Sequence, residues 1–295
     1  MKKGIILINA YATLKGISYQ STRLKEELCA LGVDCDIVRN DSVPLMIEEG
    51  GDIKSRFAGY DFCIYLDKDK YISAMLEKTG LRLFNSHEAI LTCDDKMTTL
   101  IRLADCGIPI PKTIPGLLCY TPDACVSEEL IDKIEGELGY PVIVKECYGS
   151  LGKEVYKADN RRELCLIASA LIRRPHLYQR LVKSSVGRDI RVIAVGGRVV
   201  GAMQRESKTD FRSNIELGGV GTPFTPDEAL TCLCERIADA IGLDYCGIDI
   251  LFGEDGYLVC EVNSNAFFGG IESVTGINIA KKYAEHIYNE IYNKG

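Results

Sequence analysis

The pattern of apolar residues changes along the chain, and this change constrains the fold more than any other feature. From Gly4 to Asn85, short apolar runs alternate with helix-like stretches such as Ser18–Leu31, which Gly32 closes. The alternation predicts a layered α/β domain. Its expected strands are Ile5–Ile8, Asp36–Val38, Phe62–Leu66 and Leu81–Phe84.

A second, smaller unit is expected to follow. A helix is predicted over Asp94–Cys106, because Gly107 and Pro109 end the helical pattern. The apolar run Val142–Val144 and a glycine-containing stretch, Gly149–Gly152, come next.

Beyond about residue 177 the pattern is one of hairpins. One pairs Ile190–Val195 with Val199–Met203 around a Gly196-Gly197 turn, and another pairs Gly247–Phe252 with Tyr257–Val262. Two helices, Asp227–Ile241 and Ile279–Tyr292, are expected to cover this sheet. The chain therefore divides into three predicted units, residues 1–92, 93–182 and 183–295.

Composition narrows the partners and the compartment. The 295 residues carry 35 Lys and Arg against 42 Asp and Glu, a net charge of −7, which argues against nucleic acid or an anionic membrane. The apolar run after Met1 stops at Asn9 and no run reaches the ~18 residues of a membrane span. The 13 cysteines show no zinc-like spacing and no disulfide-like framework, so we expect a cytoplasmic protein.

The last hairpin predicts a metal site. If the five-residue loop Gly253–Tyr257 closes it, Asp249 stands opposite Glu261 and Asn263 shares their face. Opposed Cβ atoms lie about 4.5–5.5 Å apart, so these oxygens would converge. They suit Mg²⁺, which combines a few carboxylates with substrate phosphates. The alternative is a solvated hairpin, and a four-residue loop would instead put Cys260 opposite Asp249.

Two lysines are placed as phosphate ligands would be. Lys145 ends the apolar strand Pro141–Lys145, where an ammonium needs an anionic partner or an exit to solvent. Lys96 lies in the first turn of a predicted helix, a position that the helix dipole disfavours unless phosphate is near. Its alternative is a surface pair with Asp94 or Asp95.

The glycines after the lysine strand offer backbone N–H groups to phosphate. Gly149, Ser150 and Gly152 would form a flap, although a plain hairpin loop has the same composition.

Two arginines are candidates for stabilising charge on a transferring phosphoryl group or a tetrahedral acyl centre. With a two-residue turn, Asp189 faces Gln204, and Arg205 falls on the side of apolar side chains. Arg212 follows after a polar loop. The alternative is an exposed strand edge. The apolar neighbours expected for Arg205 are Ile190, Val192 and Met203.

Together these motifs resemble the ATP-grasp superfamily, in particular the RimK-like α-L-glutamate ligases. The resemblance covers roughly residues 85–292 and rests on the order and spacing of Asn85–Ile90, Asp95-Lys96, Pro141–Lys145, Gly187–Arg191, Asp210–Asn214, Gly218-Gly219, Gly247–Ile250 and Glu261–Asn263. It implies an α/β and α+β protein with an ATP-grasp fold. An N-terminal Rossmann-like pre-ATP-grasp domain would be followed along the chain by two α+β units that clasp ATP between them.

The resemblance also implies roles for individual residues. ATP phosphates would be held by Lys96, Lys145 and the flap residues Gly149, Ser150 and Gly152. The linker of Arg180 and Leu181 would bind adenine through its backbone, and Asp189 would approach the ribose. Further nucleotide contacts are implied for Arg212, Ser213 and Asn214, metal ligation for Asp249, Glu261 and Asn263, and charge neutralisation for Arg205 and Arg212.

Two positions depart from the family pattern. Arg180 stands where an acidic residue is usual, and Ser264–Phe268 replaces the usual Ser/Thr-Pro-Gly run beside the acceptor site. Phe267 and Phe268 are therefore expected to make a different pocket.

The implied activity is amide-bond formation. ATP and Mg²⁺, or Mn²⁺ in its place, would activate a small-molecule or peptide carboxylate as an acyl phosphate that an amine or amino acid attacks, with glutamate the family default. Specificity is expected in Tyr11–Tyr19, Phe267–Gly270 and Arg205–Arg212. The alternatives are a nucleotide-binding regulatory module without turnover and a small-molecule binder of periplasmic type. The chain is also compatible with a homo-oligomer.

Overall fold

The N-terminal part of the protein is a parallel sheet covered by helices. The computed structural model describes residues 2–42, 45–55, 57, 59–121, 124–150 and 152–293, so Met1, Leu151 of the flap and the last two residues lie outside the described residues. The sheet has the order β2-β1-β5-β6. Its strands are β1 (Lys3–Ile8), β2 (Asp34–Arg39), β5 (Phe62–Leu66) and β6 (Arg82–Phe84), with helices α1 (Lys15–Ala30) and α2 (Lys70–Lys78). All of β5 is buried, which explains its unbroken apolar run.

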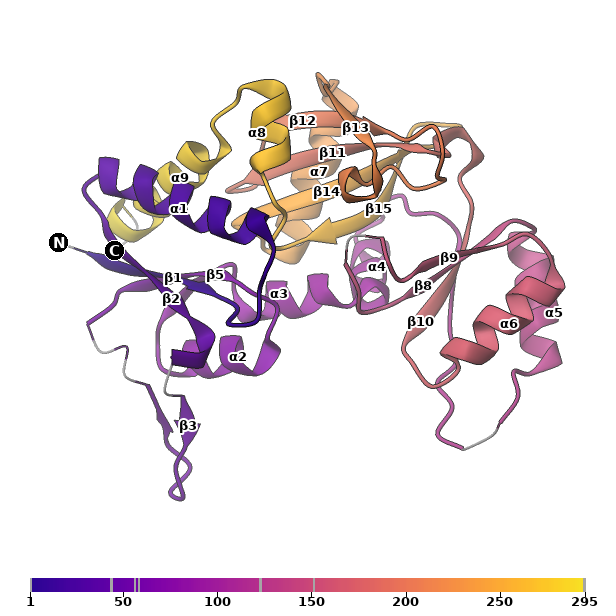
Figure 1. The fold of residues 1–295 in the computed structure, drawn as a ribbon, viewed down its shortest axis with the longest axis horizontal. Coiled ribbons are helices and arrows are strands. Elements are labelled where there is room, and N and C mark those ends of the chain that lie inside the picture. The colour runs from indigo at the N-terminus through magenta and orange to yellow at the C-terminus, as the bar shows by residue number, and fades with distance from the viewer. Residues whose placement is uncertain are drawn as a thin grey trace.

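The middle of the chain forms an antiparallel sheet with the order β7-β10-β8-β9. It lies at the right of Figure 1, with two helices against it. Side chains of both helices and of the strands share one apolar core, which includes Ile131, Val144 and Leu164. The elements are β7 (Thr113–Pro115), α5 (Glu128–Leu138), β8 (Val142–Glu146), β9 (Val155–Ala158), α6 (Arg161–Leu171) and β10 (His176–Arg180).

The C-terminal part is a five-stranded antiparallel sheet with the order β13-β12-β11-β14-β15. Alternate residues of its central strands are buried on opposite faces. Ile190 and Val192 pack under α7, whereas Ile193 and Val195 pack towards α8 and α9. The elements are β11 (Arg188–Val195), β12 (Arg198–Glu206), β13 (Val220–Pro223), α7 (Glu228–Ile241), β14 (Tyr245–Phe252), β15 (Tyr257–Asn263), α8 (Gly269–Thr275) and α9 (Ile279–Asn293).

The helix predicted over Asp94–Cys106 is in fact the second of two short helices. Helix α3 (His87–Asp94) ends where α4 (Lys96–Asp105) begins, and Asp95 between them is extended. The Asp95 carboxylate accepts hydrogen bonds from the backbone N–H of Met97 and Thr98. An N-cap therefore interrupts the helical pattern at this point, and Lys96 is the first residue of α4.

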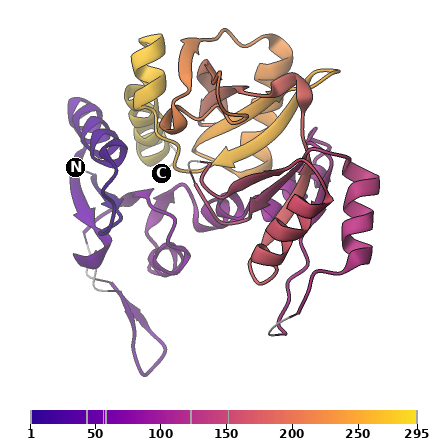
Figure 2. The ribbon, with the colours of Figure 1, turned by 45° about the vertical axis from the view of Figure 1, so that its right-hand side comes forward.

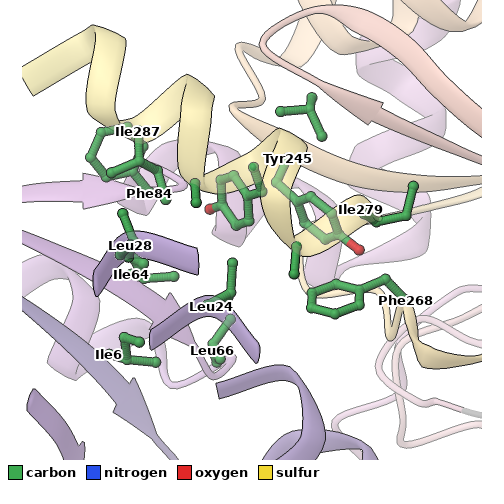
Figure 3. Close-up of a cluster of buried hydrophobic side chains, with 14 of the residues drawn as sticks. Ile6, Leu24, Leu28, Ile64, Leu66, Phe84, Tyr245, Phe268, Ile279 and Ile287 are labelled. Atoms are coloured by element: carbon green, nitrogen blue, oxygen red, sulfur yellow. The ribbon is translucent and has the colours of Figure 1, made fainter. Parts of the chain in front are cut away.

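The first and last parts of the chain share a hydrophobic core. Leu24 and Phe62 from the N-terminal layer pack with Tyr245, Phe268 and Ile279, and Figure 3 shows part of this cluster. Helices α1 and α9 lie side by side in Figure 1. This core is continuous between the first and last parts of the chain. The unit boundaries at residues 92 and 182 remain a proposal.

Asn85 fixes the N-terminal layer to the open end of the β14–β15 hairpin. Its side-chain amide donates to the carbonyls of Tyr245 and Ser264, and its Oδ1 accepts from the N–H groups of Asp244 and Tyr245. All of these bonds are buried, and together they hold the hairpin in place. Within the described residues, no helix combines the length and apolar character that a membrane span requires.

Candidate active site

A cleft between the central and C-terminal sheets collects most of the residues that the sequence singled out. Figure 2 shows the two sheets facing each other, with β14 and β15 in yellow above the central strands. The predicted residues that line the cleft are Lys96, Lys145, Gly149, Ser150, Gly152, Arg180, Leu181, Asp189, Arg205, Arg212, Ser213, Asn214, Asp249 and Glu261. Asn263 lies in an adjoining pocket instead.

The β14–β15 hairpin places Asp249 opposite Glu261, as expected, but not for the expected reason. The predicted five-residue loop is wrong, because Phe252 pairs with Tyr257 and only four residues remain between the strands. A bulge at Cys260 then shifts the register by one residue and restores the pair. The bulge also turns the Cys260 side chain into the cleft beside Glu261.

The β11–β12 hairpin corrects a second expectation. Gly196 and Gly197 form the predicted turn, with φ of 56° and 74°, a backbone conformation that glycine adopts without strain. Val200 has no partner across the strands, so the register shifts there and Asp189 faces Arg205, not Gln204. The expected apolar neighbourhood of Arg205 is therefore wrong for Ile190 and Val192, which point to the opposite face.

Four alternating charges form a buried network on this face. Arg205 binds Asp189 through Nε at 2.8 Å and Nη2 at 2.5 Å, and its Nη2 also lies 2.9 Å from Asp249 Oδ1. Arg191 donates to both oxygens of Asp249, with Nη2 at 2.8 Å from Oδ2. Burial alone would raise the pKa of Asp249, but the charges of Arg191 and Arg205 outweigh it and lower the pKa to about 2. Asp249 is therefore an anion.

Lys96 links Glu261, a predicted metal ligand, to the flap. Its Nζ lies 3.3 Å from Glu261 Oε1 and donates to the carbonyl of Gly149 at 3.0 Å. The alternative of a surface pair with Asp94 or Asp95 is wrong, because the Lys96 side chain is only 10% exposed and its ammonium pairs with Glu261. Lys96 therefore points into the cleft from the start of α4.

Lys145 is the least compensated charge in the described part of the cleft. Its side chain enters from β8, only 8% of its surface is exposed, and its Nζ lies 3.5 Å from Cys260 Sγ. Among the ion pairs between described residues, none includes Lys145. A buried ammonium without a counter-ion is unfavourable unless an anion binds beside it.

Arg212 and the flap also contact each other. The Arg212 guanidinium donates to the Gly152 carbonyl at 2.5 Å and pairs with Asp210 at 2.8 Å. On the other side of the flap, the Ser150 N–H donates to the Glu154 carboxylate at 3.2 Å. The flap residues thus already contact charged side chains that face the cleft.

Four further residues of the cleft differ in the contacts that they offer a nucleotide. Arg180 is exposed at the cleft, and its guanidinium donates to the Glu137 carbonyl. Both carboxylate oxygens of Asp189 accept from Arg205. Ser213 is buried, and Asn214 borders both the cleft and the adjoining pocket.

The adjoining pocket lies on the other side of Asp249 and Glu261. It is lined by parts of all three segments in which specificity was expected, including Tyr11, Arg205 and Phe267. Sequence reasoning assigned no role to Arg191 or Glu154. Arg191 could have been found, because it lies two residues after Asp189 and therefore shares its face of β11.

Comparison with known proteins identifies the family and the fold. The RimK-like ATP-grasp domain matches residues 93–287. The chain is 39% identical over 233 residues to human N-acetylaspartylglutamate synthase A, covering 77% of this chain and 58% of that protein. It is 37% identical over 282 residues to human beta-citrylglutamate synthase B, covering 89% and 71%. The chain thus spans little more than half of the first of these relatives.

Solved structures confirm the predicted fold class. The ATP-grasp ligase PsnB with a minimal precursor superposes with a TM-score of 0.72 at 20% identity, covering 98% of this chain and all of that one. D-alanine–D-alanine ligase from Bacillus anthracis complexed with ATP also gives 0.72, at 16% identity and with full coverage of both chains. The ATP-grasp fold is therefore shared at low sequence identity.

Proposed function

Because this chain belongs to the RimK-like ATP-grasp family, we propose that it is an ATP-dependent ligase that joins a carboxylate to an amine. The observation that carries the proposal is Lys145, a buried ammonium without a carboxylate partner among the described residues, which lines the same cleft as Asp249 and Glu261. Lysines that meet carboxylates in one cleft fit a nucleotide whose phosphates carry a metal ion.

The carboxylates fit Mg²⁺ by their chemistry. Asp249 receives three contacts from Arg191 and Arg205, which leaves one of the about four acceptor sites of a carboxylate free. Glu261 pairs with Lys96 through Oε1, and Asn263 pairs with Gly247 on the same face. These three residues would hold Mg²⁺, or Mn²⁺ in its place. The ion would neutralise charge on the transferring phosphoryl group.

The proposed reaction has two steps. A carboxylate oxygen bonds to the γ-phosphorus while the bond between that phosphorus and the β-phosphate oxygen breaks, which gives an acyl phosphate and ADP. The amine nitrogen then bonds to the acyl carbon, the bond from carbon to the phosphate oxygen breaks, and the nitrogen loses a proton. No protein nucleophile is needed.

The residues of this chain would act by binding and orientation. Lys96, Lys145 and Arg212 would neutralise phosphate charge, together with the N–H groups of Gly149, Ser150 and Gly152. Arg205 would stabilise the charge that develops on the acyl centre. We propose that Asp189 positions Arg205, and the ribose contact of Asp189 stays a prediction. The backbone of Arg180 and Leu181 would bind adenine, and Ser213 and Asn214 would complete the nucleotide site.

We propose L-glutamate as the amine, because the names of both human relatives contain glutamate and other relatives are described as probable alpha-L-glutamate ligases. The small-molecule or peptide acid differs between those names. The identity of this acid must therefore be inferred from the residues that line the adjoining pocket.

A lysine pair tests the proposal. ADP release would be measured with Mg²⁺, ATP, L-glutamate and a panel of carboxylic acids, for the wild type, Lys145→Met and Lys157→Met. Lys157 lies on neighbouring β9 and pairs with Asp159 at the surface. We expect Lys145→Met to lower ADP release roughly 10²- to 10³-fold, a loss typical for one electrostatic group of an active site, and Lys157→Met to leave it near wild type.

Binding separates this proposal from the regulatory alternative. Calorimetry should show that Mg²⁺–ATP binds to the wild type and more weakly to Lys145→Met. Nucleotide binding without ADP release for any acid would favour a regulatory module. A Lys145→Met protein with full activity would contradict the proposed site.

A further inference from the structure

The pocket that adjoins the nucleotide cleft shares its floor. Ser150, Arg205, Asn214, Asp249 and Glu261 line both spaces. A carboxylate that reaches the γ-phosphate must therefore enter from this pocket. The nature of that acid can be inferred from the pocket, and the inference rests on the proposed ligase function.

The wall above the floor is apolar and includes large side chains that face solvent. Tyr11 is 89% exposed, Leu14 46% and Tyr19 43%, although all three line the pocket. Phe267 also lines this wall. We call these four residues the apolar rim. Exposed apolar groups gathered at one pocket indicate that a ligand covers them.

Phe267 holds its place through the N-terminal loop. Its ring packs so closely on Gly16 that a Cβ there would come within 3.1 Å. Tyr19 packs in the same way on Gly269 and donates from its hydroxyl to Glu272 at 2.7 Å. The apolar rim is thus assembled from two distant segments, and one of them is the segment that departs from the family pattern.

The charges of the pocket are nearly all compensated. Of its lining cations, Arg191 and Arg205 bind Asp249, and Lys68 pairs with Asp94 at 3.2 Å. Lys15 lies exposed at the mouth. A ligand with several carboxylates would therefore meet few uncompensated cations among the described residues above the floor.

The anionic residues that line the pocket also disfavour a ligand with several carboxylates. Asp67 is buried and accepts hydrogen bonds from the side-chain amides of Asn9 and Asn40. At the floor, Asp249 pairs with Arg191 and Arg205, and Glu261 pairs with Lys96. Above the floor, a second or third carboxylate would approach the carboxylate of Asp67 and meet few uncompensated cations among the described lining residues.

We infer that the acid is an acyl-amino acid or short peptide with an apolar side chain next to its terminal carboxylate. Its carboxylate lies at the charged floor, and its side chain packs on the apolar rim. This acid would carry an apolar side chain, whereas one human relative is named for citrate, a small polycarboxylate.

Equilibrium binding tests this inference without turnover. Calorimetry in the presence of Mg²⁺ and β,γ-imido-ATP would compare N-acetyl-L-phenylalanine with N-acetylglycine, N-acetyl-L-aspartate and citrate. Burial of the phenyl group should make N-acetyl-L-phenylalanine bind roughly 10- to 100-fold more tightly than N-acetylglycine. Citrate or N-acetyl-L-aspartate binding as tightly as N-acetyl-L-phenylalanine, or more tightly, would overturn the inference.

A rim variant provides the matched comparison. Tyr11→Ala should reduce the ratio of the dissociation constants of N-acetylglycine and N-acetyl-L-phenylalanine about 3- to 10-fold, since it removes one aromatic ring from the apolar rim. Tyr120→Ala, equally exposed but on the central unit, should keep the full preference. An unchanged preference in Tyr11→Ala would contradict the rim. Absence of ADP release with every acid counts against the ligase function, whereas the ranking of acids counts only for or against this inference.

Discussion

The two hairpins that carry the site respond differently to a bulge. In β14–β15 a bulge at Cys260 compensates for a turn one residue shorter than expected, so Asp249 still faces Glu261. In β11–β12 the turn is as expected, and the unpaired Val200 moves Arg205 opposite Asp189. A turn alone therefore does not determine which side chains meet at the far end of a hairpin, because a bulge shifts every pair beyond it.

The largest effect on activity is expected from the charge of Glu261 on β15. Glu261→Gln keeps the size of the side chain but removes the anion opposite Asp249. We expect ADP release to fall roughly 10²- to 10³-fold and Mg²⁺–ATP to bind more weakly, because the metal loses one charged ligand. Enzyme assays and calorimetry would measure both. Glu254→Gln, in the exposed turn of the same hairpin, is the control, and equal losses in the two variants would break the assignment.

The β14–β15 hairpin is also anchored at its open end, by Asn85. Asn85→Ala removes four buried hydrogen bonds, at a cost of ~1 kcal/mol each before relaxation, so we expect unfolding free energy to fall by roughly 2–4 kcal/mol. Urea unfolding of wild type and variant would measure the loss. A change below about 1 kcal/mol would mean that the shared hydrophobic core, not Asn85, positions this hairpin.

The β11–β12 hairpin depends on the shape of one guanidinium. Arg205→Lys keeps the charge, but a single ammonium nitrogen cannot reproduce the two-point contact with Asp189 together with the contact with Asp249. Hydrogen bonds to charged groups contribute about 1.5–3 kcal/mol, so ADP release should fall roughly 10- to 100-fold. Arg198→Lys, on the same strand but exposed and paired with Glu235, should have little effect. Comparable activity of the Arg205 and Arg198 variants would remove Arg205 from the active site.

The smallest effect is expected at the bulge itself. Cys260→Ala leaves the backbone register of β15 unchanged, and the thiol makes a long contact with Lys145. We expect ADP release to change less than about 3-fold, as is usual when no charge or packing volume of the core is lost. A larger loss in the assay would give the thiol a role that the bulge alone does not explain.

Periodicity was enough to predict most of the fold. The parallel strands, the two C-terminal hairpins and helices such as α7 follow from apolar patterns and glycine signals that act over a few residues. The split between α3 and α4 was missed, because Asp95 caps a new helix within an apparently continuous helical pattern. The shared core around Tyr245 and Phe268 joins segments more than 200 residues from Leu24, and no local pattern carries that information.

The site was predictable in its members but not in its contacts. Lys145 was expected to need an anion, and it has none among the described residues. The pairing of Lys96 with Glu261, and of Arg191 with Asp249, depends on how strands and sheets face each other. Such contacts follow from tertiary structure and from bulges, which depend on packing beyond the hairpin.

Isotope transfer tests the central claim, that this cleft activates a carboxylate by phosphorylation, most directly. The acid that gives the fastest ADP release would be labelled with ¹⁸O at both carboxylate oxygens and incubated with Mg²⁺, ATP and L-glutamate. We predict that each phosphate released carries one ¹⁸O atom from the acid, because the bond between the acyl carbon and that oxygen breaks in the second step. Release of ADP and unlabelled phosphate, with all ¹⁸O retained in the acid, would contradict this mechanism.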